Sequence, residues 1–170
     1  MNFGRLPRIA IAGLLLTAGP SFAAPVDWSK SQPFDEPLLE WVVKKSPGGA
    51  TAAFGQPEAD NIVIILKCDG GRAIKASRPD SGFEPYSAYA VHLRAGTRQA
   101  QTPATTQERW DLDDLVELNF QIPNAPEFMS ALKASPTLDL VVQGRGSFLQ
   151  GIKIPLPRAK LAPFFKSCGL

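Results

Sequence analysis

The chain has 170 residues, of which 44% are hydrophobic and 20% are charged, and its formal net charge is +2 at neutral pH. Two of its 18 basic residues and none of its 16 acidic residues lie in the leader described next, so the rest of the chain carries no net charge. A neutral chain without a block of Lys or Arg excludes the electrostatic footprint of a protein that binds nucleic acid or an anionic membrane surface.

The first two dozen residues are typical of an export signal. Arg5 and Arg8 form a positive n-region, and residues 9–18 form a short apolar h-region. A small-x-small pattern then predicts cleavage between Ala23 and Ala24. An apolar run of about ten residues is too short to span a bilayer core about 30 Å thick, so we expect no transmembrane segment after removal of the signal. The sequence therefore predicts a periplasmic or secreted bacterial protein.

The rest of the chain is predicted to contain a flexible arm and one domain. Residues 24–37 are polar and rich in Pro without hydrophobic periodicity, so we expect an arm without regular structure. Residues 38–170 show no internal repeat, and their number is typical of one domain with its own core. We therefore expect a signal peptide over 1–23, an arm over 24–37 and a globular domain over 38–170.

Short apolar runs and alternating patterns, separated by turn residues, predict a series of strands. The strongest signal is the unbroken run IVIIL at 62–66, which we interpret as part of a central strand buried on both faces. The polar segments 77–86 and 97–109 are interpreted as loops, and Gly151 as a β-bulge. We expect strands over 39–43, 50–54, 61–68, 72–76, 89–94, 116–122, 138–142 and 148–156.

Two short helices complete the prediction. Asn124 followed by Glu127 is a variant of the capping box, and it predicts a helix that ends before Pro136. Pro163 confines the start of a terminal helix, because Pro is tolerated in the first turn. That helix carries one apolar stripe, Leu161, Phe164, Phe165 and Cys168. These elements predict a mainly β fold of the α+β class, an antiparallel sheet or sandwich with two short helices.

Cys68 and Cys168 are the two cysteines of the chain. In an oxidising compartment an even count predicts a disulfide, and each cysteine continues the apolar face of its own element. A bridge closing about 100 residues stabilises by roughly 4–5 kcal/mol in the chain-entropy model. We expect this bond to tie the terminal helix to the central strand. The alternatives are two unrelated buried thiols or a metal site, which would lack companion ligands.

No residue pattern predicts a catalytic centre, a metal site or a bound cofactor. His92 is the only histidine, and its neighbours place it on the polar face of a strand, where we interpret it as solvated. Replacing it by Ala is therefore expected to leave function unchanged. Residues 130–133 match the S-x-x-K motif, but the supporting motifs of that enzyme class are missing, so Ser130 and Lys133 are interpreted as ordinary exposed helix residues.

The acidic cluster of Asp111, Asp113 and Asp114 lacks the further oxygen ligands and the turn Gly of a calcium loop. We interpret it as a solvated turn.

Two loops offer candidate binding residues. The segment SGFEPY at 81–86 is similar to the Ser-Gly-x-x-Tyr loop of periplasmic lysozyme inhibitors, with one extra residue before the Tyr. We interpret it as a surface loop with Phe83 or Tyr86 turned inward. The alternative is a binding patch, since aromatic side chains are enriched at binding hot spots. The second loop is the segment Gly-Arg-Gly at 144–146, which we interpret as a hairpin turn with Arg145 exposed.

The order of parts resembles small exported bacterial proteins of the invasion-associated locus B type and, less closely, periplasmic accessory proteins of type VI secretion. The pieces that carry the resemblance are A-x-F-G-x-P, a strand ending in Cys, a basic hairpin, a helix before two strands, and F-F-x-x-C-G. They lie at 52–57, 62–71, 92–98, 128–156 and 164–169. The resemblance implies a secreted, β-rich accessory protein, and it supplies no functional residues.

The leading hypothesis is a non-enzymatic accessory or binding protein of the bacterial envelope, whose partner is another envelope or secreted protein. The alternative is an inhibitor or immunity protein against an exported hydrolase. A third hypothesis is an enzyme of unrecognised type. Nothing in the sequence specifies an oligomeric state.

Overall fold

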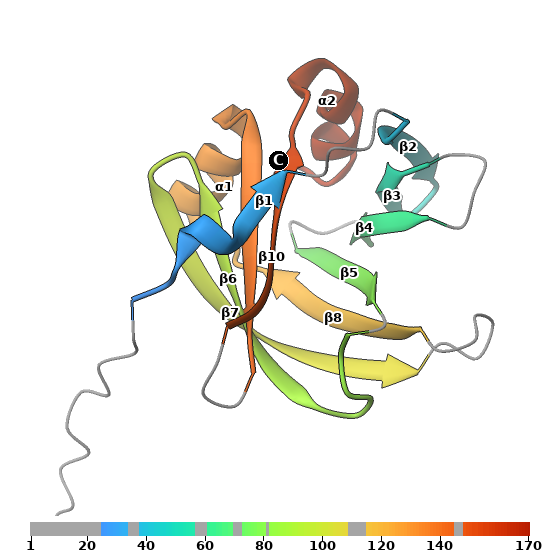
Figure 1. Ribbon diagram of the computed structural model, residues 1–170. Helices are drawn as coiled ribbons and strands as arrows, with labels where there is room; N and C mark the ends of the chain where they lie inside the picture. The colour runs from blue at the N-terminus through green and yellow to red at the C-terminus, as the bar shows by residue number, and fades with distance from the viewer. Residues whose placement is uncertain are drawn as a thin grey trace, which may run out of the picture.

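One curled sheet of ten strands forms the body of the protein, with two helices at one end (Figure 1). This computed structural model describes residues 25–33, 38–56, 61–69, 73–80, 82–108, 115–144 and 148–170. The strand order is β1-β10-β9-β6-β7-β8-β5-β4-β3-β2. The predicted fold class, mainly β with two short helices, is confirmed.

The strands are β1 (Ser31–Pro33), β2 (Glu40–Ser46), β3 (Gly49–Gly55), β4 (Ile62–Cys68), β5 (Ile74–Asp80), β6 (Ala88–Ala95), β7 (Arg98–Glu108), β8 (Val116–Ile122), β9 (Thr137–Gln143) and β10 (Phe148–Pro155). The helices are the short 3-10 helix η1 (Trp28–Lys30), α1 (Pro126–Ala134) and α2 (Arg158–Ser167). Every paired strand is antiparallel to its neighbour except β1, which pairs with β10 in parallel.

The curl brings the two ends of the strand order close together. The indole Nε1 of Trp41 in β2 donates a hydrogen bond to the carbonyl oxygen of Pro155 at the end of β10, at 2.6 Å. A buried indole N–H needs such a partner. The inner faces of the strands then enclose one apolar core, to which β4 contributes Ile64 and Leu66 and β9 contributes Leu140.

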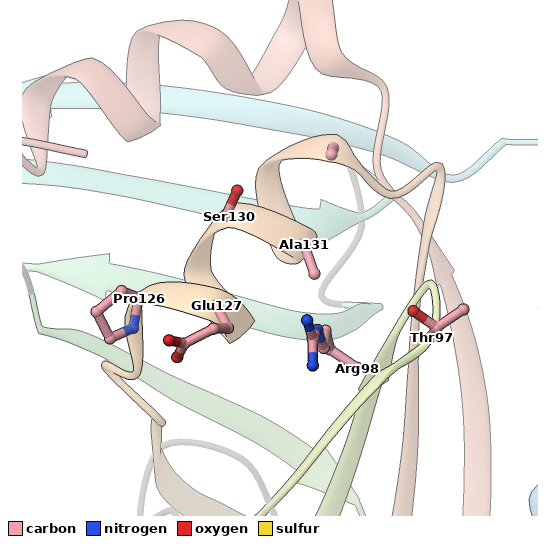
Figure 2. Close-up of a pocket in the computed structure, with 7 residues that line it drawn as sticks. Thr97, Arg98, Pro126, Glu127, Ser130 and Ala131 are labelled. Carbon is pink, nitrogen blue, oxygen red and sulfur yellow. The ribbon is translucent and has the colours of Figure 1, made fainter.

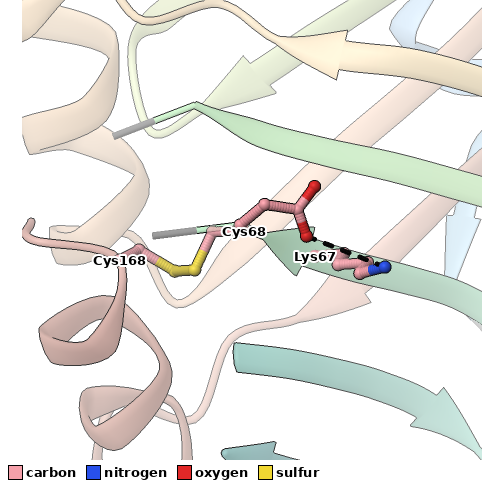
Figure 3. Close-up of a disulfide and its surroundings, with 4 residues drawn as sticks. Lys67, Cys68 and Cys168 are labelled. Atoms are coloured by element: carbon pink, nitrogen blue, oxygen red, sulfur yellow. Dashed lines mark ion pairs between the residues drawn. A yellow bond between two sulfur atoms is a disulfide. The ribbon is translucent and has the colours of Figure 1, made fainter. Parts of the chain in front are cut away.

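The predicted disulfide is confirmed and links β4 to the residue that caps α2 (Figure 3). The Cα atoms of Cys68 and Cys168 lie 5.7 Å apart, and both side chains are buried. Leu161, Phe164 and Phe165 are also buried, as their 3.6-residue spacing predicts. Beside the disulfide, the exposed carboxylate of Asp69 pairs with Lys67 at 3.7 Å and with Lys75 at 3.0 Å.

Both helices begin differently from the prediction. Pro163 lies inside α2, which starts at Arg158, so Pro163 does not mark the first turn. The N-cap of α1 is Ala125 rather than Asn124, and it makes no side-chain capping bond. Pro126 occupies the first turn of α1 instead, where its fixed φ suits the helix and its missing N–H is not needed.

One predicted loop is almost entirely a strand, and another is a strand in its first four residues. β5 continues through residues 77–80, and β7 covers almost all of the polar segment 97–109. β7 pairs with β6 along its whole first part and with β8 along its second part. Its side chains are mainly Thr, Gln and Ala, so its own composition does not indicate a strand. The neighbouring strands impose the pairing.

The segment 25–33, here called the N-terminal strap, differs from the predicted arm without regular structure. It contains η1 and β1, and it runs beside β10 (blue in Figure 1). The Oγ of Ser31 donates a hydrogen bond to the carbonyl oxygen of Ile152 at 2.7 Å. Backbone pairing, which needs no hydrophobic period, holds this strap.

Gly151 does not form the predicted bulge. It lies where the strap packs against β10. The register of β10 shifts between Phe148 and Gln150 instead. A Cβ atom at position 151 would overlap the backbone of Lys30 and Ser31, so the missing side chain lets the strap approach β10 closely.

Within the described residues, no helix has the length and apolar character needed to cross a membrane.

Candidate functional site

The loop between β5 and β6 places its two aromatic residues in opposite environments. Phe83 is buried and packs against the ring of Tyr89, with ring centroids 5.4 Å apart. Tyr86 is 70% exposed, and its φ of 54° lies in the left-handed region that side chains other than Gly rarely adopt. Of the two predicted aromatic binding residues, Tyr86 is therefore available to a partner, whereas Phe83 belongs to the core.

Hydrogen bonds from neighbouring strands hold the backbone around Tyr86. The Oγ1 of Thr106 in β7 donates to the carbonyl oxygen of Glu84 at 2.7 Å and accepts from the backbone N–H of Ser87 at 2.8 Å. The hydroxyl of Tyr89 accepts from the backbone N–H of Glu84 at 3.0 Å. These bonds bracket Tyr86 on both sides and keep it in its strained conformation, a cost of about 1–3 kcal/mol for such residues. The loop is preorganised with its aromatic ring in solvent.

The hydroxyl of Tyr86 donates to the carboxylate Oε2 of Glu108 at 3.3 Å. Desolvation, together with the negative charge of Glu108, raises the pKa of Tyr86 above its ordinary value. The phenol therefore stays neutral at physiological pH and can both donate and accept hydrogen bonds.

Arg145 lies outside the described residues, as do the acidic residues Asp111, Asp113 and Asp114. The cleavage site at Ala23 and Ala24 also falls there. These predictions therefore remain predictions.

The interpretation of His92 as a solvated residue is wrong. Its side chain is 6% exposed, and its Nε2 lies 2.8 Å from the Oε1 of Gln143. The alternation of β6 correctly turns His92 away from the core, but the N-terminal strap lies over that face. Pro25, Val26 and Trp28 line a groove together with His92. Because His92 is buried and hydrogen-bonded, His92→Ala is expected to lower stability, whereas the sequence predicts only that function stays unchanged.

A charged pair lies beside His92 under the strap. Arg94 Nε and Nη2 donate to the Oδ2 of Asp139 at 2.8 and 2.5 Å, and the guanidinium lies 4.5 Å from the ring centroid of Trp28. The register of β6 and β9 sets Arg94 directly opposite Asp139. Arg94 therefore links β6 to β9 through the ion pair and to the N-terminal strap through the cation–π contact with Trp28. These contacts indicate a structural role for Arg94.

Two adjoining hollows lie on either side of α1. The first, of about 510 Å³, lies between α1 and the turn that joins β6 to β7 (Figure 2). The second, of about 370 Å³, lies between α1 and the end of α2. Ser130 lines both, and Lys133 lines the second. Both side chains are exposed, as predicted for Ser130 and Lys133, and no hydrogen bond joins them in the described part of the chain.

Residues that sequence reasoning missed are Trp28, Arg98 and Glu127. Arg98 and Glu127 line the first hollow, and Trp28 covers the outer face of β6. A weak signal existed for Glu127, which stands in the first turn of a predicted helix. Arg98 lies in a segment that the sequence predicts to be a loop, and Trp28 in the predicted arm, so nothing in the sequence indicates which residues surround them.

Among the described residues, no group of three or more His, Cys, Asp or Glu side chains could hold a metal ion. Comparisons with protein-family models, curated proteins and solved structures found no match to this chain.

Proposed function

We propose that this chain is a non-enzymatic, exported binding protein of the bacterial envelope, and that it contacts a protein partner through the loop that carries Tyr86. The observation that carries the proposal is the presentation of Tyr86, an exposed ring on a loop held by hydrogen bonds from β6 and β7. Aromatic rings on preorganised backbone supply contact area at low entropic cost. The buried polar cluster around His92 offers no comparable access.

Export rests on the leader, and the disulfide is compatible with it because such bonds persist in oxidising compartments. The intact mass of the protein recovered from the periplasm should correspond to a chain that begins at Ala24. Full-length protein confined to the cytoplasm would contradict the proposal. The likeness to exported accessory proteins of the locus B type supports the same assignment.

Site-specific photocrosslinking in living cells tests the binding surface. A photoreactive phenylalanine analogue replaces Tyr86 in one strain and Leu38 in another. Leu38 is the matched control, because it is a second large apolar residue that is 65% exposed. We expect a discrete crosslinked adduct from position 86 and none from position 38. Equal adducts at both positions, or none at either, would contradict a specific surface at Tyr86.

The second candidate function is inhibition of an exported hydrolase. It is favoured by the rigid backbone on both sides of one projecting side chain, which suits insertion into a cleft. Purified protein should then slow the lysis of cell walls by lysozyme, and Tyr86→Asn should abolish the effect. Asn tolerates the left-handed conformation, so this variant keeps the loop while removing the ring. Unchanged lysis rates would exclude lysozyme as the target.

A further inference from the structure

The first hollow beside α1 carries a pair of opposite charges on opposite walls. The turn after β6 supplies Thr97 and Arg98, and α1 supplies Glu127 and Ser130. Figure 2 shows Glu127 and Arg98 on two sides of the hollow, one on the helix and the other on the hairpin. The hollow is shallow and open to solvent, and its volume of about 510 Å³ admits a small molecule.

Neither charge is neutralised by the part of the chain that the structure describes. Arg98 and Glu127 form no ion pair with each other or with other described residues, and neither side chain makes a hydrogen bond there. Other exposed charges of this protein do pair, as Lys160 does with Glu40 at 2.9 Å. The hollow therefore presents one uncompensated cation and one uncompensated anion to anything that enters it.

The two walls are held in a fixed relation to each other. Gly96, with a φ of 58°, makes the turn before Thr97, and its N–H donates to the Oγ of Ser135 at 3.1 Å. That same Oγ donates to the carbonyl oxygen of Thr137 at 2.6 Å, just after α1. The hairpin tip is thus anchored to the end of the helix, so the backbone of one wall is tied to the backbone of the other.

We propose that this hollow binds a small zwitterion, a free amino acid or a dipeptide, with its carboxylate on Arg98 and its ammonium group on Glu127. The guanidinium fork matches a carboxylate, and charge-assisted hydrogen bonds are the stronger kind. The hydroxyls of Thr97 and Ser130 supply further donors and acceptors, while Ala131 leaves room for a side chain. A ligand with a single charge would leave either Arg98 or Glu127 without a partner of opposite charge. This site is separate from the Tyr86 loop, which lies at the other end of β6.

Titration followed by NMR of the 15N-labelled mature chain tests the proposal with four probes. L-Alanine and L-alanyl-L-alanine carry both charges, N-acetyl-L-alanine keeps the carboxylate alone, and L-alaninamide keeps the ammonium group alone. We expect the zwitterions to shift the amide signals of Thr97, Arg98 and Ser130 saturably, with a Kd on the order of 1 mM. Each blocked analogue should bind about tenfold or more weakly, because it loses one charge-assisted hydrogen bond. The preference between alanine and the dipeptide identifies which zwitterion fits.

Three variants assign the two charges. Arg98→Gln should remove the preference for alanine over alaninamide, and Glu127→Gln should remove the preference for alanine over N-acetylalanine. Lys133→Gln is the matched control, since it removes a charge from the same helix outside this hollow. All three side chains are exposed, so the fold should survive. Absence of saturable shifts with both zwitterions, equal affinity for all four probes, or an equal loss in Lys133→Gln would overturn the proposal.

Discussion

β4 and β7 are both interior strands of the same sheet, but they are stabilised by different means. β4 is built from aliphatic residues, and Ile64 and Leu66 are almost completely buried. β7 buries Thr102, Ala104 and Thr106 in alternation, none of them a large apolar side chain. Burial of apolar area drives the first strand into the core, whereas β7 is held by backbone pairing with β6 and β8. A strand between two strong neighbours can therefore have a composition that is typical of a loop.

The largest expected effect lies on the β4 side and concerns the disulfide. Cys68→Ser combined with Cys168→Ser should lower the free energy of unfolding by about 2–5 kcal/mol, because the unfolded chain loses its cross-link. Urea denaturation of the variant, with the wild type and its reduced form as references, measures the change. A midpoint equal to that of the oxidised wild type would contradict a stabilising role for this bond.

The next effect is the core contribution of β4 itself. Leu66→Ala should cost about 2–5 kcal/mol, since it removes buried methyl groups and leaves a cavity. Lys67→Ala, at the exposed neighbouring position of the same strand, is the control and should change stability by less than about 0.5 kcal/mol. Thermal unfolding of the two variants compares them directly, and similar melting temperatures would mean that β4 is not buried as described.

In β7 the corresponding contribution comes from the hydroxyl of a buried threonine, Thr106, rather than from an aliphatic side chain. Thr106→Val keeps the shape but removes the bonds to Glu84 and Ser87, so we expect a loss of about 1–3 kcal/mol. Thr105→Val, whose side chain is exposed, should be close to neutral. Hydrogen exchange at the amide of Ser87 should quicken in the first variant alone. Equal exchange rates at Ser87 in the two variants would mean that the hydrogen bonds of Thr106 do not hold the Tyr86 loop.

These contrasts explain how far the sequence could predict the fold. The β4 run, the stripe of Leu161 and Phe164, and the disulfide followed from local periodicity, because burial there matches residue type. β7 could not be predicted, since its burial comes from its neighbours. The alternation of β6 predicts the correct face for His92. The burial of that face could not be predicted, because the strap that covers it has no hydrophobic periodicity.

The candidate site was predictable only in part. Phe83 and Tyr86 stand in one loop with similar side chains, and the sequence could not decide which ring turns inward. That choice depends on Tyr89 and Thr106, which come from two different strands. Arg98 and Glu127 are 29 positions apart in the chain and line one hollow only because α1 packs beside the turn between β6 and β7, where Gly96 is bonded to Ser135.

A smaller effect is expected at the strap, which also depends on backbone contacts. Gly151→Ala should displace it, because the new Cβ would overlap Lys30. Hydrogen exchange at Ser31 should accelerate strongly, while the global melting temperature should change little. Gly48→Ala is the control, since a Cβ there meets no atom within 4 Å. Unaltered exchange at Ser31 would show that the strap does not need the close approach.

The smallest effect is a pH dependence within the strap. The side-chain hydrogen bond from Ser29, followed by the bond from its backbone N–H, lowers the pKa of Asp27. A carboxyl whose pKa is lowered by folding stabilises the folded form above its unfolded pKa, and that contribution disappears as the pH falls through the folded value. The protection of the Ser29 amide, measured against the intrinsic exchange rate at each pH, should therefore fall below about pH 4, and Asp27→Asn should remove this fall.

The Cys68–Cys168 bond also makes most of the chain a covalent ring. The two cysteines are separated by 100 positions, and β5 to β10 with both α-helices lie between them. A protease that cuts one peptide bond anywhere in that interval adds the mass of a water molecule but releases no fragment until the disulfide is reduced. A cut between the end of β3 and Cys68, by contrast, leaves the strap and the first hairpin with no covalent tie to the rest. After a single cut, the ring survives as one molecule in an oxidising environment, and its fragments separate only in a reducing one.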